Sequence, residues 1–176
     1  LATNIFGVYK SASAGTLTIS NNTIGSDTQS NSINATSGST SNPQIVTGIY
    51  NAGSGSIIFN GNLIANLTNG TTNATAGTAG VVNGITSING SNDITNNIIH
   101  DLTIANANTN ATNNASACGI SLTTATLRNI TGNKIYNLSN TFTSFAGSVT
   151  GLYFSGSTGG NNISGNFIHS LSITSG

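Results

Sequence analysis

Apolar residues recur along this chain in short groups with fixed internal spacing, separated by stretches of Asn, Ser, Thr and Gly. One group has apolar residues at its first and sixth positions, Asn at its fourth and, in four of five copies, Leu at its ninth. Its copies occupy residues 19–24, 59–67, 94–102, 130–138 and 163–171. Because Asn is invariant at the fourth position, the copies represent one degenerate repeat.

A second group precedes each copy of the first and contains Gly followed by an aliphatic residue. Its copies occupy residues 5–9, 46–50, 82–86, 117–121 and 149–153. Successive glycines are 41, 36, 35 and 32 residues apart (48 − 7, 84 − 48, 119 − 84 and 151 − 119). This drift excludes helical-hairpin arrays, which hold their period closely, and favours a coil whose strands have fixed length while one loop varies.

The spacing predicts three short strands in each repeat, because β-branched residues alternate with Asn, Gly and Ser turns and no helical stripe occurs. We expect an all-β chain folded as a right-handed parallel β-helix, or solenoid, of about five coils. Each coil has three strands, followed by a variable polar loop such as 69–80 or 106–116. Residues 1–176 then form a single segment without evident caps, with repeats at 5–45, 46–81, 82–116, 117–148 and 149–176.

In such a solenoid, equivalent residues of neighbouring coils stack about 4.8 Å apart. The aliphatic positions should form interior columns, with Asp27 replacing Leu in the first copy. The invariant Asn should form a buried ladder, because a carboxamide can bond to its copies above and below; the alternative is a set of solvated turn residues. The expected ladder is Asn22, Asn62, Asn97, Asn133 and Asn166.

These repeats, with their Gly-Ile pairs and their Ile-Ser-Gly-Asn turns, resemble the right-handed parallel β-helix repeats of the pectate-lyase-like superfold. The segment 133–140 is similar to repeat regions of large secreted bacterial surface proteins of the type IX secretion kind. The resemblance covers nearly the whole chain. It implies the fold and an extracellular or cell-surface location, but not one function, since this superfold includes lyases, hydrolases, adhesins and stalks.

Charge is scarce, with three Lys/Arg, three Asp and no Glu among 176 residues. A neutral chain so poor in Lys and Arg lacks the electrostatic footprint for nucleic acid or an anionic membrane. No apolar run reaches the roughly 18 residues of a membrane span, so we expect no membrane insertion. The chain contains no Met, which suggests a processed product or an interior segment of a longer protein.

The residues that could carry chemistry are few. Enzymes of the related superfold use converging carboxylates, but we expect Asp93 and Asp101 to face different sides of the third coil and Asp27 to lie in the first. His100 and His169 are expected to face outward two coils apart, too far to share a metal. Lys10, Lys134 and Arg128 form no patch. The sequence therefore predicts no catalytic residue, metal site or cofactor, and no enzyme.

Cys118 has no partner for an intramolecular disulfide, and its repeat column otherwise contains Phe, Thr and Asn. We expect a buried or half-buried, inert thiol.

The predicted function is a structural or adhesive extracellular module that forms a stalk, a surface layer or a head-to-tail fibre. Its expected partner is another copy stacked on its end, or the continuation of a longer chain. The alternative is a carbohydrate-binding or polysaccharide-degrading β-helix domain. Tyr9, Tyr50 and Tyr153 are the candidate glycan contacts, although Thr86 and Ser121 interrupt their column.

Overall fold

The computed structural model describes residues 3–73, 80–107, 115–123, 128–155 and 160–174, and within these ranges all regular structure is β-strand. The strands that belong to the first sheet are β1 (Ile5–Lys10), β5 (Gln44–Asn51), β8 (Gly80–Ser87), β11 (Ala117–Leu122) and β14 (Val149–Phe154). Those of the second sheet are β2 (Leu17–Ser20), β6 (Ser56–Asn60), β9 (Ser91–Thr95), β12 (Arg128–Thr131) and β15 (Asn162–Ser164). The third sheet contains β3 (Thr23–Gly25), β4 (Ile33–Ser37), β7 (Leu63–Thr71), β10 (Ile98–Ile104), β13 (Lys134–Asn140) and β16 (Phe167–Ile173).

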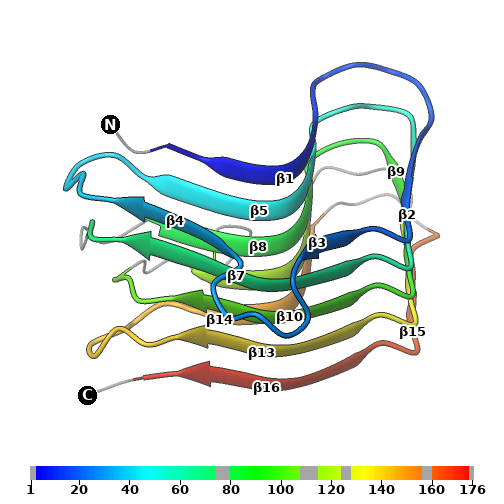
Figure 1. Cartoon of the computed structure of the whole chain (residues 1–176). Coiled ribbons are helices and arrows are strands. Elements are labelled where there is room, and N and C mark those ends of the chain that lie inside the picture. Colours follow the sequence, from blue (N-terminus) through cyan, green and yellow to red (C-terminus); the bar gives the residue numbers. More distant parts are fainter. Residues whose placement is uncertain (1–2, 74–79, 108–114, 124–127, 156–159, 175–176) are drawn as a thin grey trace.

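The chain passes through the three sheets in turn and returns to the first, so that every neighbour in a sheet comes from the next repeat. All pairings are parallel and the winding is right-handed, with the two termini at opposite ends of the stack (Figure 1). This architecture confirms the predicted all-β parallel solenoid with three strands per coil. Three coils, those of β5–β7, β8–β10 and β11–β13, are covered on both sides, whereas the first and last have one open side.

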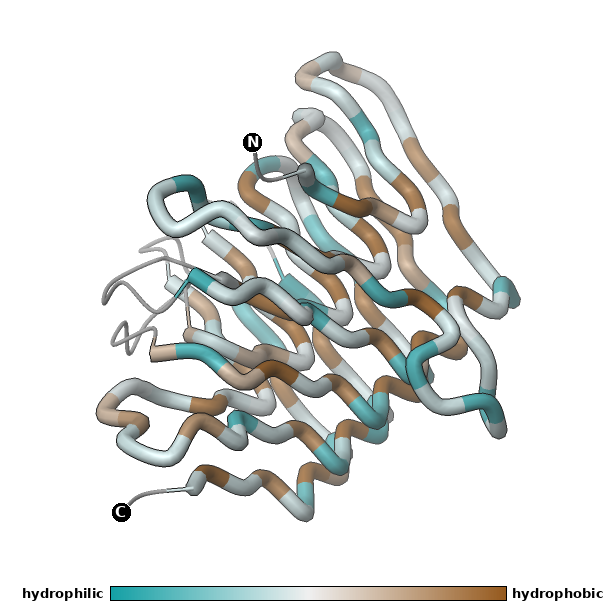
Figure 2. The backbone as a smooth tube through the Cα atoms, turned by 60° about the vertical axis from the view of Figure 1, so that its left-hand side comes forward, coloured by the Kyte–Doolittle hydropathy of each residue, from teal (hydrophilic) through white to brown (hydrophobic). Residues whose placement is uncertain are grey.

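The interior consists of columns of aliphatic residues, visible as brown bands that recur from coil to coil (Figure 2). The predicted columns are confirmed by strand register, since Ile99 pairs with Ile64 and Ile135, and Leu102 with Leu67 and Leu138. These side chains have no exposed surface in the three covered coils. Burial of each such side chain contributes about 1.5–3 kcal/mol, which offsets the ordering of its coil.

Gly and Ile columns face each other across the interior, which explains the fixed Gly of the repeat. A Cβ at Gly84 would lie 2.5 Å from Ile99 Cγ2 and 2.6 Å from the Gly119 carbonyl oxygen. The same clash with the facing Ile recurs at Gly48 and Gly119. Only a residue without a side chain leaves room for the Ile column at this wall.

A backbone bulge in the third sheet explains why Ile and Leu of one strand, three positions apart, both point inward. The residue at the bulge is skipped in the strand register and adopts a positive φ, as at Asn66 (59°) and Asp101 (53°). Asn and Asp tolerate this left-handed conformation better than most residues. Asn137 (54°) and Ser170 (53°) occupy the same position in the last two coils.

The asparagine ladder runs along the bend between the second and third sheets. The Asn97 amide Nδ2 donates to Asn133 Oδ1 (3.0 Å) and to the Phe59 carbonyl (2.9 Å). Its own Oδ1 accepts from the Asn62 backbone N and Nδ2, both at 2.9 Å. The same bonds link Asn22 to Asn62 and Asn133 to Asn166. Asn62, Asn97 and Asn133 are buried, which excludes the reading of these three as solvated turn residues.

The first coil departs from the expected pattern. Ile33, not Asp27, occupies the Leu position, because Ile33 pairs with Leu67 while Gly25 pairs with Ala65. Residues 26–32 therefore form an excursion, which we call the 26–32 loop, between β3 and β4. The long third-strand loops expected at 69–80 and 106–116 lie partly outside the described residues, at 74–79 and 108–114.

Candidate functional site

The 26–32 loop folds back over the outer face of the third sheet. Asn66 Nδ2 donates to the Ser26 carbonyl (2.8 Å), and Ser32 Oγ donates to the Asn66 carbonyl (3.3 Å). Thr68 Oγ1 donates to Asn31 Oδ1 farther along the loop. These bonds hold both ends of the loop against β7 and place its middle over β10.

The loop brings Asp27 onto His100, which lies on β10 two strands away. His100 Nε2 lies 3.0 Å from Asp27 Oδ1, and His100 Nδ1 lies 2.7 Å from Asp101 Oδ2. The His100 side chain is 3% exposed, against 66% for Asp27 and 38% for Asp101. Two sequence-based expectations are therefore wrong. His100 was expected to face solvent, but it is buried. Asp27 and Asp101 were expected not to converge, but both contact His100.

The reason for the error is physical. The repeat places His100 on the outer face of its strand, but whether an outer face meets solvent depends on what covers it. The available signal was the 41-residue step between the first two glycines, the longest in the chain. That excess length includes the loop that covers His100.

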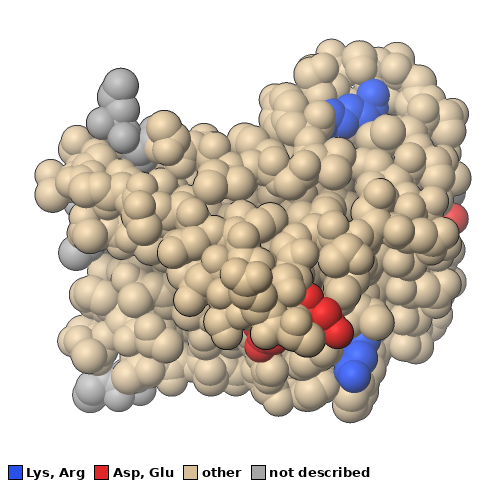
Figure 3. Space-filling view, in the orientation of Figure 1, with Lys and Arg blue, Asp and Glu red and all other residues tan. Residues whose placement is uncertain are grey.

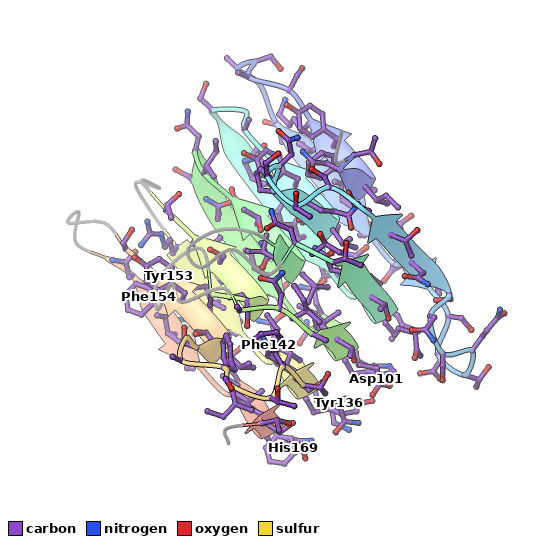
Figure 4. The ribbon with its side chains drawn as sticks, turned by 90° about the vertical axis from the view of Figure 1, so that its left-hand side faces the viewer. Asp101, Tyr136, Phe142, Tyr153, Phe154 and His169 are labelled. Carbon is purple, nitrogen blue, oxygen red and sulfur yellow. The ribbon has the colours of Figure 1, made fainter. Side chains whose placement is uncertain are left out.

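Aromatic rings continue from His100 along the same column. Tyr136 stacks on His100 with ring centroids 4.7 Å apart, and His169 stacks on Tyr136 at 5.0 Å. Lys134 Nζ lies 4.7 Å from the Tyr136 ring centroid. Burial and then the charges of Asp101 and Asp27 raise the pKa of the Tyr136 hydroxyl. The two histidines are thus linked through Tyr136, and the labelled Asp101, Tyr136 and His169 lie together at one edge (Figure 4).

A polar pocket of about 280 Å³ lies between the loop and the sheet. Its walls include both carboxylates of the cluster together with hydroxyl and amide groups. Figure 3 shows acidic side chains gathered in one place on this otherwise largely uncharged face. The lining residues are Asp27, Thr28, Ser30, Asn31, Asn66, Thr68, Asp101 and Thr103.

Metal coordination finds no support in the parts of the chain that the structure describes, since no group of three or more His, Cys, Asp or Glu is placed to hold an ion. Asp93 lies elsewhere, on the second sheet, where its Oδ1 accepts from Asn129 Nδ2 at 2.8 Å. What the Asp27–His100–Asp101 cluster can do is exchange protons, because it contains three titratable groups in contact.

The candidate glycan-contact tyrosines do not form one surface. Tyr9 and Tyr50 stack with centroids 5.4 Å apart, and Phe6 packs against both. Tyr9 is 56% exposed. Tyr153 is separated from Tyr50 by β8 and β11, a distance of roughly 14 Å at the usual strand spacing.

Two further side chains are buried. Cys118 has no exposed surface, and its burial raises the pKa of the thiol to about 12. Arg128 is 1% exposed, donates to the Ser155 carbonyl and lies 6.0 Å from the Phe154 ring centroid. Desolvation lowers the pKa of its guanidinium. Burial of Cys118 agrees with the sequence-based expectation.

No protein-family model matches this chain, and neither the curated proteins nor the solved structures contain a match to it. The described residues also include no helix long and apolar enough to cross a membrane.

Proposed function

We propose that this chain is a structural repeat module that extends a rod, as a stalk, a surface layer or a head-to-tail fibre outside the cell. The observation that carries the proposal is the state of the last coil. Its interior columns are uncovered, with Ile168 39% and Leu171 38% exposed, whereas their counterparts in the covered coils are fully buried. Another coil of the same design would bury them, whether it comes from the same polypeptide or from another copy.

The hydrogen bonds at the two ends of the stack support another coil of the same design as the neighbour. In the inner coils the ladder Asn donates its backbone N–H to the Asn of the next coil, as Asn133 does to Asn166 (3.0 Å). The Asn166 N–H lacks such a partner among the described residues. At the other end, Asn22 Nδ2 turns to the Ser20 carbonyl instead of to a preceding coil. Asn22 of a following module would continue the ladder from Asn166.

The remaining parts of the proposal rest on the sequence. The low charge and the repeats resemble those of large secreted surface proteins of the type IX secretion kind, which favours an extracellular setting. A role as stalk or adhesin requires no catalytic step. The prediction that the chain is not an enzyme drew partly on the assumed separation of Asp27 from Asp101, and it stays a prediction.

A two-copy chain tests the proposal. Direct fusion leaves seven residues (174–176 and 1–4) between Ile173 and Ile5, against eight (141–148) between Asn140 and Val149. We expect the fused chain to unfold in one transition, at a higher temperature than the single copy, because β14–β16 gain a covering coil. Small-angle scattering should show one continuous rod.

Matched variants sharpen this test. Leu171→Asp places a charge in the interior column at the junction, whereas Ser172→Asp places it on the outer face of the same strand. Leu171→Asp should lower the unfolding temperature of the fused chain more than that of the single copy, and Ser172→Asp should affect both equally. Equal unfolding temperatures for the fused and single chains would refute end-to-end stacking.

A second candidate function, binding or cleavage of carbohydrate, is favoured by the polar pocket with its two carboxylates. Sugars are recognised by such hydroxyl, amide and carboxylate groups, and glycoside hydrolysis uses paired carboxylates. A glycan array, followed by cleavage assays on pectin and alginate with calcium, tests this function. A hit that Asp101→Ala abolishes and Asp93→Ala does not would favour it over a purely structural role.

A further inference from the structure

Both ring nitrogens of His100 face carboxylate oxygens, at 2.7 Å for Asp101 and 3.0 Å for Asp27. A neutral imidazole has one N–H and one lone pair, so only one of these contacts can then be a hydrogen bond. The other would set a lone pair against a carboxylate oxygen. When the ring is protonated, both nitrogens donate and both contacts become charge-assisted hydrogen bonds.

From this geometry we propose that Asp27, His100 and Asp101 form a proton-dependent latch that holds the 26–32 loop on the third sheet. The latch is closed when His100 is an imidazolium between two carboxylates. Loss of the ring proton breaks one of the two contacts and releases the middle of the loop.

The contact that breaks is the one to Asp27. Asp101 is the chain neighbour of His100, and its second carboxylate oxygen accepts from Asn137 Nδ2 at 3.1 Å. The Asp27 side chain is 66% exposed, and among the described residues His100 is the one hydrogen-bonding partner of its carboxylate. Deprotonated His100 can keep its single N–H on Asp101, and Asp27 then moves into water at little cost.

Apart from the two aspartates, the groups that face His100 do not change charge when the ring loses its proton. Asp27 comes from the loop, Asp101 from its own strand and Tyr136 from β13, while Ala65 on β7 carries no charge. Because the pKa of Tyr136 is raised, its hydroxyl stays neutral while an imidazole titrates. Lys134 and His169 both contact the Tyr136 ring rather than the His100 ring.

The direction of the pH dependence follows from these charges. The latch is closed while the ring is protonated and both carboxylates are ionised, because only then do both ring nitrogens donate to carboxylate oxygens. A contact that requires the protonated ring is lost as pH rises through the titration of that ring. In strong acid the carboxylates themselves gain protons and the contact weakens again. Opening moves Asp27, and with it one wall of the polar pocket.

A spin label on the loop measures the latch. Gln29 is exposed at the loop tip, and Gln29→Cys supplies a labelling site with which Cys118 does not compete, because its thiol is buried and has a pKa raised to about 12. Electron paramagnetic resonance across a pH series from about 5 to about 9 should show a label that is immobilised at the acidic end and mobile at the alkaline end. The mobile-to-immobile ratio should rise about tenfold per pH unit above the midpoint, up to its plateau.

Three variants of the labelled protein test whether Asp27 and His100 cause the change in label mobility. Asp27→Ala should leave the label mobile throughout the pH series, and His100→Gln should remove the pH dependence. Asp93→Asn, which alters a carboxylate on another sheet, should leave the transition unchanged. Circular dichroism establishes that each variant is folded. A label whose mobility is independent of pH, or a transition that persists in Asp27→Ala, would overturn the proposal without affecting the role of the chain as a rod.

Discussion

Asn97 has no exposed surface, yet every polar atom of its side chain has a partner. Burying an amide without hydrogen bonds is unfavourable by about 1–3 kcal/mol in proteins. The ladder avoids that penalty because each Asn supplies what its neighbour lacks. Removal of one member therefore affects three coils at once.

The replacement Asn97→Ala should lower the free energy of unfolding by about 1–3 kcal/mol, because the Asn62 backbone N–H loses its acceptor and the Phe59 carbonyl loses the Asn97 amide donor. Asn129→Ala is the matched control, since Asn129 makes its bonds on the outer face of the second sheet. That variant should lose less than about 1 kcal/mol. Denaturant unfolding of the two variants compares them directly, and equal losses would contradict the ladder as a source of stability.

Ser170 adopts a φ of 53° at the bulge of the last coil, where the three inner coils have Asn or Asp. Ser170→Gly should stabilise the protein by about 0.5–1 kcal/mol, because glycine adopts positive φ without a steric penalty. Ser172→Gly, in the same strand at an ordinary φ, should destabilise it by a similar amount. Thermal unfolding measures both changes, and stabilisation by both replacements, or by neither, would show that the bulge is not strained.

At the scale of one element, the strands of the first sheet require glycine opposite isoleucine. Gly84→Ala should destabilise the protein by about 1–3 kcal/mol, because its Cβ would meet both Ile99 and the fixed Gly119 carbonyl. A Cβ at Gly38 would meet nothing within 4 Å, so Gly38→Ala is the control and should be neutral or slightly stabilising. Chemical denaturation distinguishes them; tolerance of Ala at position 84 would mean that the sheets move apart easily.

Strands were predictable from sequence because equivalent positions of the repeats have the same surroundings and therefore carry similar residues. Ile99 and Asn97 each belong to a column, so the interior column and the ladder followed from spacing alone. The column of Gly84 is as regular, but the structure was needed to show that it faces Ile99. The Asp27–His100 contact was not predictable, since the 26–32 loop occurs once and has no copy to compare. His100 shows the limit most clearly: its column fixes the direction of its side chain but not the loop that buries it.

At the scale of the whole molecule, stability should vary along the axis. Inner coils have hydrogen-bonded neighbours on both sides, whereas β16 has one neighbour, and Phe167 and Ile173 on it are 60% and 52% exposed. Solenoid stability is approximately a sum of coil and interface terms, so terminal coils open first.

Hydrogen exchange followed by mass spectrometry tests this gradient. Peptides that cover β8–β10 should exchange slowest and those that cover β14–β16 fastest, by at least about tenfold, since losing one interface of about 1.4 kcal/mol changes an opening equilibrium by that factor. The two-copy chain provides the control, because its first-copy β14–β16 should become as protected as the inner strands. Uniform protection in the single copy would contradict a stack of separable coils.

The 26–32 loop leaves the third sheet at Gly25 and returns at Ile33, in line with Leu67. The loop replaces the bulge residue, which is the position of the strand that pairs with no residue of the neighbouring strands. The strand segments on either side of the loop therefore keep their register. A peptide inserted at the equivalent Asp101 or Asn137 should likewise leave the fold intact. The solenoid thus has a built-in grafting point in each coil, through which evolution or a protein engineer can vary the surface without redesigning the frame.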